Sequence, residues 1–211
     1  DFNRKVNRLE REYKEVKNEN KEIKVNVGLL SIALIAVLIL AFIGIFNGLV
    51  RLRNQVKNAW SQIDVQLKRR HDLIPNLLET VRGYMKHERE TLESVTNARN
   101  LAQQASSSGA GVRSKAEAEL SSALARLLVV VENYPDLKAN QNFLALQEEL
   151  TSTENKISFS RQYYNDSVLK YNNQTQMFPS SIVAGMTDFK TSEFFEVTAA
   201  EERAVPKVSF T

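Results

Sequence analysis

The pattern of hydrophobic and polar positions divides the first part of the chain into three blocks. Residues 1–26 are rich in charge, residues 27–46 (VGLLSIALIAVLILAFIGIF) carry none, and a second charged stretch follows. A bilayer core of roughly 30 Å is crossed by about 20 helical residues at 1.5 Å each. The helix of a soluble protein is rarely apolar on every face over such a length. The pattern therefore predicts a transmembrane helix over residues 27–46.

A cleaved signal sequence is the alternative interpretation of this apolar stretch. The apolar part of a signal sequence is usually about 7–15 residues long and ends at a cleavage site of small residues. Here the run is longer, and IFNGLVRLR closes it. Basic side chains that could reach lipid headgroups flank it on both sides, namely Lys21, Lys24, Arg51, Arg53 and Lys57. These features favour a retained anchor.

The charged stretch before the anchor has the a/d pattern of a coiled coil, with steps of three and four residues. The seam contains Val6, Leu9, Tyr13, Val16, Asn20 and Ile23. A single asparagine at an a position, here Asn20, fixes the register of many parallel coiled coils. Because an isolated helix of this length is marginally stable in water, we expect residues 1–26 to self-associate. The alternative is a solvated juxtamembrane helix without a partner.

Helical periodicity resumes directly after the apolar stretch. Apart from one gap, apolar residues recur at steps of three or four from Leu49 to Val95, which predicts a long amphipathic helix that continues to about Gln104. Pro75 should kink or break this helix, because proline lacks the amide hydrogen that a helix interior uses. The run SSSGAGVRS, residues 106–114, is the clearest predicted loop.

Two further helices are predicted in the second half of the chain. One extends from Ser114 to Asn133, and the spacing of Ser114 and Glu117 is that of a capping box at its start. A turn around Pro135 leads to the other helix, over residues 136–174. Together with the first helix, these elements predict an antiparallel bundle.

The C-terminal part of the chain is predicted to pack along the bundle. Residues 181–186 (SIVAGM) and then 189–197 (FKTSEFFEV) are expected to form a short turn and helix, and residues 204–210 (AVPKVSF) are expected to be extended. The predicted fold class is all-α, with a juxtamembrane coiled coil (1–26), a single transmembrane helix (27–46), an elongated antiparallel bundle of long helices (47–178) and a C-terminal extended strap (179–211).

Composition and charge exclude several classes of protein. The 28 Lys and Arg residues nearly balance the 25 Asp and Glu residues, which argues against a dedicated nucleic-acid-binding protein. The chain has no cysteine and therefore forms neither a disulfide nor a thiolate metal site. Residues 1–24 contain eight Lys and Arg and residues 51–70 contain six, so the positive-inside rule does not determine the orientation in the membrane.

A search for catalytic patterns yields no site, and we predict no catalytic residue, cofactor or metal ion. His71 and His87 lie 16 residues apart, which is not the spacing of metal ligands on one helix face. His71 is expected to contact a neighbouring helix, and His87 is expected at the surface. Trp60 is expected in the bundle core, and Phe194-Phe195 are expected to form a lid over the core rather than an exposed binding site.

The basic triplet Lys68-Arg69-Arg70 could suggest phospholipid binding. In a straight helix it lies about 33 Å beyond Phe46, and headgroup fields fade within about 10 Å. The triplet is therefore expected to face solvent or acidic neighbours. Three glutamates of the last long helix are expected to be solvated, namely Glu148, Glu149 and Glu154.

Several long stretches of the chain resemble the LemA family. The resemblance begins with IFNGLVRLRNQV and AWSQIDVQLKRRHDLIPNLLETVRGYMKHE, resumes with ENYPDLKANQNFLALQEELTSTENKISFSRQYYNDSVLKYN, and closes with FPSSIVAG and PKVSF. It implies a bacterial single-pass protein of the inner membrane, with an N-terminal anchor and a cytoplasmic helical bundle. It also implies an association with membrane zinc metallopeptidases of the HtpX type, because family members are often encoded beside them.

These observations predict a non-enzymatic membrane protein that forms a homo-oligomeric scaffold or adaptor. Its expected partners are the lipid bilayer and further copies of itself, without nucleic acid. The alternative is a regulatory or substrate-delivering partner of an HtpX-type membrane metallopeptidase in membrane-protein quality control.

Overall fold

The computed structural model describes residues 2–196, with side chains for all of them except residues 3–12 and 15. Every regular element within this range is a helix, which confirms the prediction of an all-α fold. The chain forms two compact units, Asp1–Gly48 and Leu49–Thr211. The segment AVPKVSF lies outside the described residues.

The N-terminal unit is the first part of helix α1, which is assigned from Phe2 to Arg82. Among the described residues, α1 is the one helix long and apolar enough to cross a membrane, and no part of its most apolar window is buried. The hydroxyl of Ser31 donates a hydrogen bond to the carbonyl oxygen of Val27 (2.8 Å). The polar side chain of the predicted span is thereby satisfied within the helix, as a hydrocarbon environment requires.

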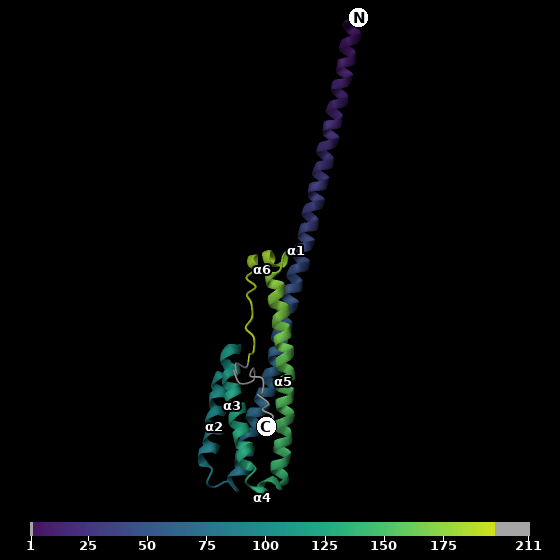
Figure 1. Ribbon diagram of the computed structural model, residues 1–211. Helices are drawn as coiled ribbons and strands as arrows, with labels where there is room; N and C mark the ends of the chain where they lie inside the picture. The colour runs from purple at the N-terminus through teal and green to yellow at the C-terminus, as the bar shows by residue number, and fades with distance from the viewer. Residues whose placement is uncertain (1, 197–211) are drawn as a thin grey trace, which may run out of the picture. The chain divides into compact units, whose positions relative to one another are not determined.

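In the second unit, the C-terminal part of α1 packs with three helices, α2 (Arg89–Gln104), α3 (Ala110–Val131) and α5 (Gln141–Gln176) (Figure 1). The one-turn helix α4 (Pro135–Lys138) connects α3 to α5, which confirms the predicted turn around Pro135. The core between these helices is one cluster of buried apolar side chains, namely Ile74, Leu77, Leu78, Val81, Met85, Leu92, Val95, Ala98, Ala102, Leu120, Ala123, Leu127, Val131, Leu137 and Phe143.

Helices α1 and α5 continue past the turn that joins α2 to α3, and there different elements cover them. Helix α6 (Ser180–Met186) packs on α5, and residues 189–196, here called the strap, return from α6 toward α3 (Figure 1). The ring of Trp60 lies 5.2 Å from that of Tyr164 and 5.9 Å from that of Phe195. Phe195 is buried, so the prediction of a lid is confirmed for this residue.

Two asparagines of α5 pair with the backbone of the strap. Asn172 Nδ2 donates to the carbonyl of Ser192 (3.0 Å), and the Ser192 amide donates to Asn172 Oδ1 (2.8 Å). Asn165 makes the same pair of bonds with Phe195, at 3.2 and 2.9 Å. These amides satisfy backbone groups that would otherwise need a helix or a neighbouring strand. The short helix predicted after the last long helix is therefore confirmed at SIVAGM, in α6, and is wrong for the described residues 189–196.

Pro75 does not break α1, which continues to Arg82. Proline cannot donate a hydrogen bond to the carbonyl four residues earlier, which is that of His71. Arg99 of α2 supplies the missing donor, because its Nε lies 2.8 Å from the His71 carbonyl oxygen. The helix predicted to reach about Gln104 therefore divides after Arg82 rather than at Pro75.

The predicted loop over residues 106–114 is mostly helical. The short helix η1 (Ala105–Ser107) and α3 leave only Ser108–Gly109 between them. The capping box is wrong, because α3 begins without a side-chain cap and Ser114 lies inside it. Glu117 is buried and pairs with α1 instead of capping α3. Helix α5 also starts later than predicted, since the side chain of Asn140 accepts hydrogen bonds from the amides that follow it.

Replacement of Arg99 with methionine should leave the carbonyl of buried His71 unpaired and lower the free energy of unfolding by about 1–3 kcal/mol. The change Pro75→Ala supplies an amide donor within α1, so Arg99→Met should cost less in that background. Urea unfolding of the detergent-solubilised full chain, followed by circular dichroism, measures both values. Arg126→Met, at an exposed arginine of α3, is the control. Equal costs in the two backgrounds would show that Arg99 acts through packing rather than through this carbonyl.

Candidate functional site

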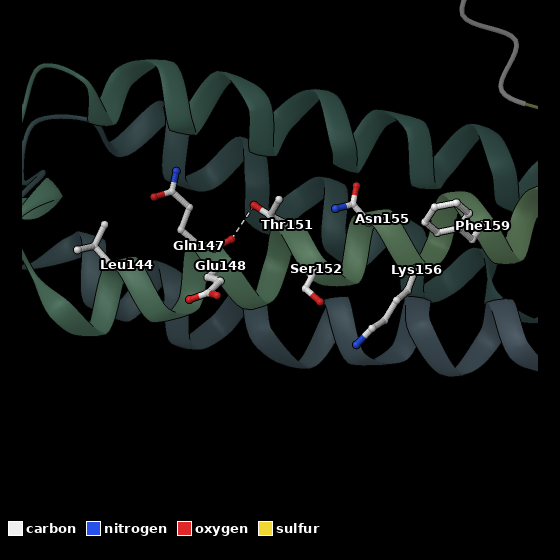
Figure 2. Close-up of a pocket in the computed structure, with 8 residues that line it drawn as sticks. All are labelled: Leu144, Gln147, Glu148, Thr151, Ser152, Asn155, Lys156 and Phe159. Atoms are coloured by element: carbon white, nitrogen blue, oxygen red, sulfur yellow. Dashed lines mark hydrogen bonds between the residues drawn. The ribbon is translucent and has the colours of Figure 1, made fainter.

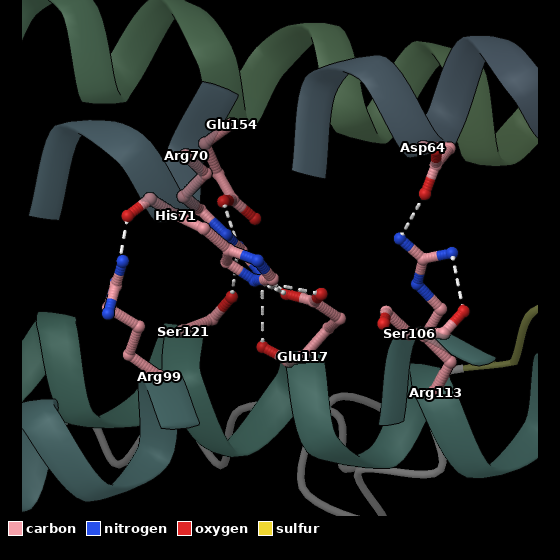
Figure 3. A network of polar contacts seen from close by, with 9 residues as sticks. All are labelled: Asp64, Arg70, His71, Arg99, Ser106, Arg113, Glu117, Ser121 and Glu154. Atoms are coloured by element: carbon pink, nitrogen blue, oxygen red, sulfur yellow. Dashed lines mark hydrogen bonds and ion pairs between the residues drawn. The ribbon is translucent and has the colours of Figure 1, made fainter. Parts of the chain in front are cut away.

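Arg70 lies at the centre of a polar network between α1, α3 and α5 (Figure 3). Its side chain is only 2% exposed. Nη1 donates to Ser121 Oγ (2.9 Å) and to a carboxylate oxygen of Glu154 (2.6 Å). Nη2 donates to the carbonyl (3.3 Å) and to the carboxylate of Glu117. One arginine thus joins three helices through charge-assisted hydrogen bonds, which are stronger than neutral ones.

Glu117 also contacts His71, whose Nε2 lies 3.1 and 3.3 Å from the two carboxylate oxygens. Burial by itself raises the pKa of Glu117. The hydrogen bond with His71 and the positive charge of Arg70 outweigh that effect, so the pKa is lowered from its ordinary value of 4.5. Glu117 is therefore ionised at neutral pH although it is buried. Glu154 is 51% exposed, so the network meets solvent on the α5 side.

A second ion pair joins α1 to α3 nearby (Figure 3). The buried guanidinium of Arg113 lies 2.5 Å from a carboxylate oxygen of Asp64 and donates to the carbonyl of Ser106 (3.4 Å). The same guanidinium lies over the ring of Trp60, 5.2 Å from its centre. Two charged contacts along one pair of helices fix their register, because a shift of either helix would separate both.

The geometry assigns this network a structural role. His71 and Glu117 form an acid–base pair of a kind that enzymes use, but both side chains are buried and Arg70 occupies the carboxylate. Glu154 faces the same guanidinium, whose charge would repel a cation. Within the described part of the chain, no group of three or more His, Cys, Asp or Glu side chains could hold a metal ion.

A groove of about 280 Å³ lies next to the network, between α3 and α5. Arg70, Ser121 and Glu154 line one end of it. The other end is lined mainly by leucines, namely Leu77, Leu124, Leu128 and Leu150. The groove therefore changes from charged to apolar along its length.

The outer face of α5 carries a second, more open hollow of about 700 Å³ (Figure 2). Only α5 lines it, with the exposed side chains of Leu144 and Phe159 at its two ends. Thr151 Oγ1 donates to the carbonyl of Gln147 within it (2.8 Å). Because one helix cannot enclose a ligand, this hollow is a surface feature. Gln147, Thr151 and Asn155 line both the hollow and the groove, so they form the ridge between them.

The residues predicted for self-association and for the membrane interface are mostly exposed. Four residues of the predicted seam have described side chains, and all four are exposed, namely Tyr13, Val16, Asn20 and Ile23. The side chains of Val6 and Leu9 lie outside the description. The five predicted interface residues are also exposed, namely Lys21, Lys24, Arg51, Arg53 and Lys57. Arg53 in addition stacks over the ring of Phe189, 4.7 Å from its centre.

The basic triplet faces acidic neighbours, as expected. Arg69 pairs with Glu149 (2.7 Å), and Arg70 pairs with Glu117 and Glu154. The prediction that Glu149 and Glu154 are merely solvated is therefore incomplete, because each is about half exposed and also ion-paired. The spacing of the buried partner, Glu117, from Ser114 fits a helix cap equally well, so the sequence does not reveal this ion pair.

Comparison with known proteins decides the family. A family model described as the LemA family matches residues 59–210. The chain belongs to the LemA family. It is 28% identical over 171 residues to "Protein LemA" of Metamycoplasma hominis, a match that covers 79% of this chain and 76% of that protein.

A second group of similar proteins carries a different name. "Magnetosome protein MamQ 2" of Paramagnetospirillum magneticum is 29% identical over 90 residues, which is 43% of this chain and 33% of that protein. "Magnetosome protein MamQ" of Magnetospirillum gryphiswaldense is 28% identical over 90 residues. These matches extend over about a third of the MamQ chains, so they relate part of this chain to part of a longer protein.

Replacement of Glu117 with glutamine should lower the free energy of unfolding by about 3–5 kcal/mol, because the buried charge of Arg70 loses its buried partner. A carboxylate with a lowered pKa adds stability that is fully present above its ordinary pKa of 4.5 and is lost as the pH falls through the folded-state value. Thermal midpoints of the detergent-solubilised chain between pH 3 and pH 7 measure this loss.

The exposed Glu119 on the same helix is the matched control. Glu119→Gln should keep the acid-dependent loss of stability, whereas Glu117→Gln should reduce it. If both variants show the full acid dependence, Glu117 is not the group that couples proton binding to unfolding.

Proposed function

We propose that this protein is a non-enzymatic, single-pass membrane scaffold that assembles with further copies of itself through the heptad before the anchor. The exposed seam carries this proposal. Tyr13 is 69% exposed, Val16 54% and Ile23 59%, so each keeps a large apolar surface that nothing else in the described chain covers. Burial of apolar surface against a second helix is the main source of coiled-coil stability.

Topology supports the same arrangement. Copies inserted with one orientation present their pre-anchor helices in parallel, which is the geometry that an asparagine at an a position favours. The anchor also confines the copies to two dimensions, which lowers the entropic cost of association. The helix before the anchor would then mediate assembly, and the bundle after it would present a rigid surface.

We place the protein in the bacterial inner membrane with the bundle in the cytoplasm. The apolar helix and the LemA membership support a membrane location. The cytoplasmic orientation rests on the resemblance to the family. The bundle carries grooves and charged side chains suited to protein contacts, and its charged network is engaged internally rather than poised for chemistry.

The assembly proposal predicts that Asn20→Val changes the size or stability of the oligomer, because this substitution removes the polar position that specifies register and strand number. A chain lacking residues 1–24 should lose the oligomer. Light scattering of detergent-solubilised protein, corrected for bound detergent, gives the mass. Lys21→Gln, at an exposed position off the seam, is the control. An unchanged mass and stability in both Asn20→Val and the deletion would rule out the coiled coil as the assembling element.

Purification from native membranes separates a scaffold from an adaptor of a membrane peptidase. A scaffold should emerge as a large particle composed of this chain. A stoichiometric zinc metallopeptidase in the same particle would instead favour the regulatory or substrate-delivering role that the family resemblance implies. The composition can be read by quantitative mass spectrometry of the purified particle.

A further inference from the structure

Four large apolar side chains are exposed where α5 ends and α6 begins. Met177 is 60% exposed, Phe178 80%, Ile182 56% and Met186 72%. Ile182 and Met186 lie four residues apart on α6 and therefore share one face of it, while Met177 and Phe178 directly precede the helix. These four side chains are here called the α6 patch. A concentration of exposed apolar surface of this kind indicates a binding surface.

The α6 patch lies at the end of the bundle where the second unit begins. This unit starts at Leu49, and four residues later the guanidinium of Arg53 stacks over the ring of Phe189, 4.7 Å from its centre. The Phe189 amide in turn donates a hydrogen bond to the carbonyl of Ala184 in α6 (3.1 Å). These contacts hold α6 beside the first turns of α1 that belong to the bundle (Figure 1).

The predicted membrane anchor ends close to the same point of the chain. Its last residue is Phe46, and the three residues from there to Leu49 reach at most about 11 Å even when fully extended. The headgroup layer itself adds roughly 5–7 Å beyond the hydrocarbon core on each side. The end of the bundle that carries the α6 patch is therefore tethered next to the lipid headgroups.

Basic residues predominate in the two segments next to the α6 patch. Residues 49–57 and 170–190 contain a single acidic residue, Asp188, which lies 3.6 Å from Lys190. The same segments contain five basic residues, namely Arg51, Arg53, Lys57, Lys170 and Lys190. An anionic lipid surface attracts such a basic segment, and apolar side chains beside basic ones are typical of protein surfaces that enter the headgroup layer.

We propose that the α6 patch docks on the surface of the bilayer in which this chain is anchored, with Phe178, Ile182 and Met186 among the lipid headgroups. The proposal rests on the membrane anchor of the proposed function, but it does not depend on self-association. Docking gives the bundle a second contact with lipid besides the anchor. That contact limits the tilt of the bundle and turns one face of it toward the membrane.

Fluorescence quenching by lipids tests the proposal on the full chain, which has no native cysteine to interfere. Met186→Cys carries a nitrobenzoxadiazole dye, and the protein is reconstituted into vesicles of equal amounts of phosphatidylcholine and phosphatidylglycerol. Part of the phosphatidylcholine carries a nitroxide close to its headgroup. Phe159→Cys, at a residue of α5 that is 73% exposed, is the matched control. Ile43→Cys, inside the predicted span, reports insertion of the anchor.

We expect the nitroxide lipid to quench the dye at Met186→Cys about twofold or more as strongly as the dye at Phe159→Cys. The double change Met177→Ser and Ile182→Ser should lower the quenching at Met186→Cys by about half, because it removes apolar side chains that enter the headgroup layer. The same substitution at the exposed Val129 of α3 should leave the quenching unchanged.

The dye at Ile43→Cys separates failure of the docking from failure of the anchor. Equal quenching at Met186→Cys and Phe159→Cys, with strong quenching at Ile43→Cys, would overturn the docking and leave the anchor in place. Absence of quenching at Ile43→Cys would overturn both. A blue-shifted emission at Met186→Cys that depends on the number of copies per vesicle, without quenching by lipid, would also overturn the docking, because a second copy would then cover the α6 patch.

Discussion

A positive charge at Arg70, inside the bundle, is the constraint on which the arrangement of the helices depends. A buried guanidinium is tolerated only when its hydrogen bonds are directed at acceptors and a negative charge lies close by. Glu117 supplies both from α3, Glu154 adds a carboxylate from α5, and Ser121 adds a hydroxyl. Three helices are therefore held at one level by a single side chain. Hydrophobic packing alone would permit these helices to slide in steps of a turn.

The network also marks a change in how the protein builds its core. On one side of it, α1, α2, α3 and α5 share an apolar cluster of the kind found in four-helix bundles. On the other side, α2 ends at Gln104 and α3 begins at Ala110, and beyond these helix ends the strap and α6 cover α1 and α5 instead. An extended segment has no backbone partners of its own, so α5 supplies them through Asn165 and Asn172. The strap also lies close to the start of α3. At Gly109, a Cβ atom would lie only 2.9 Å from a carboxylate oxygen of Glu193 in the strap.

Periodicity was sufficient to predict the helices but not the polar contacts that decide their boundaries. The apolar stripe on α1 identified its buried face, including His71, because burial and a 3.6-residue repeat are linked directly. The predicted break at Pro75 was wrong, because the donor that replaces its missing amide comes from Arg99, on another helix, and no local pattern encodes such a partner. Likewise Glu117 and Ser114 have the spacing of a capping box, and only the position of Arg70 across the bundle shows that Glu117 has a different role.

The carboxylate partners of Arg70 lie far after it along the chain, so the ribosome makes them later than the arginine. Glu117 follows it by 47 residues and Glu154 by 84. At ribosomal rates of about 5–20 residues per second, the last partner is made roughly 4–17 s after the arginine. During that interval the anchor has already been synthesised, and Glu117 and Ser121 become available to Arg70 before Glu154 does. The complete network, with both of its carboxylates, can thus form only after the chain has been synthesised as far as Glu154 in α5.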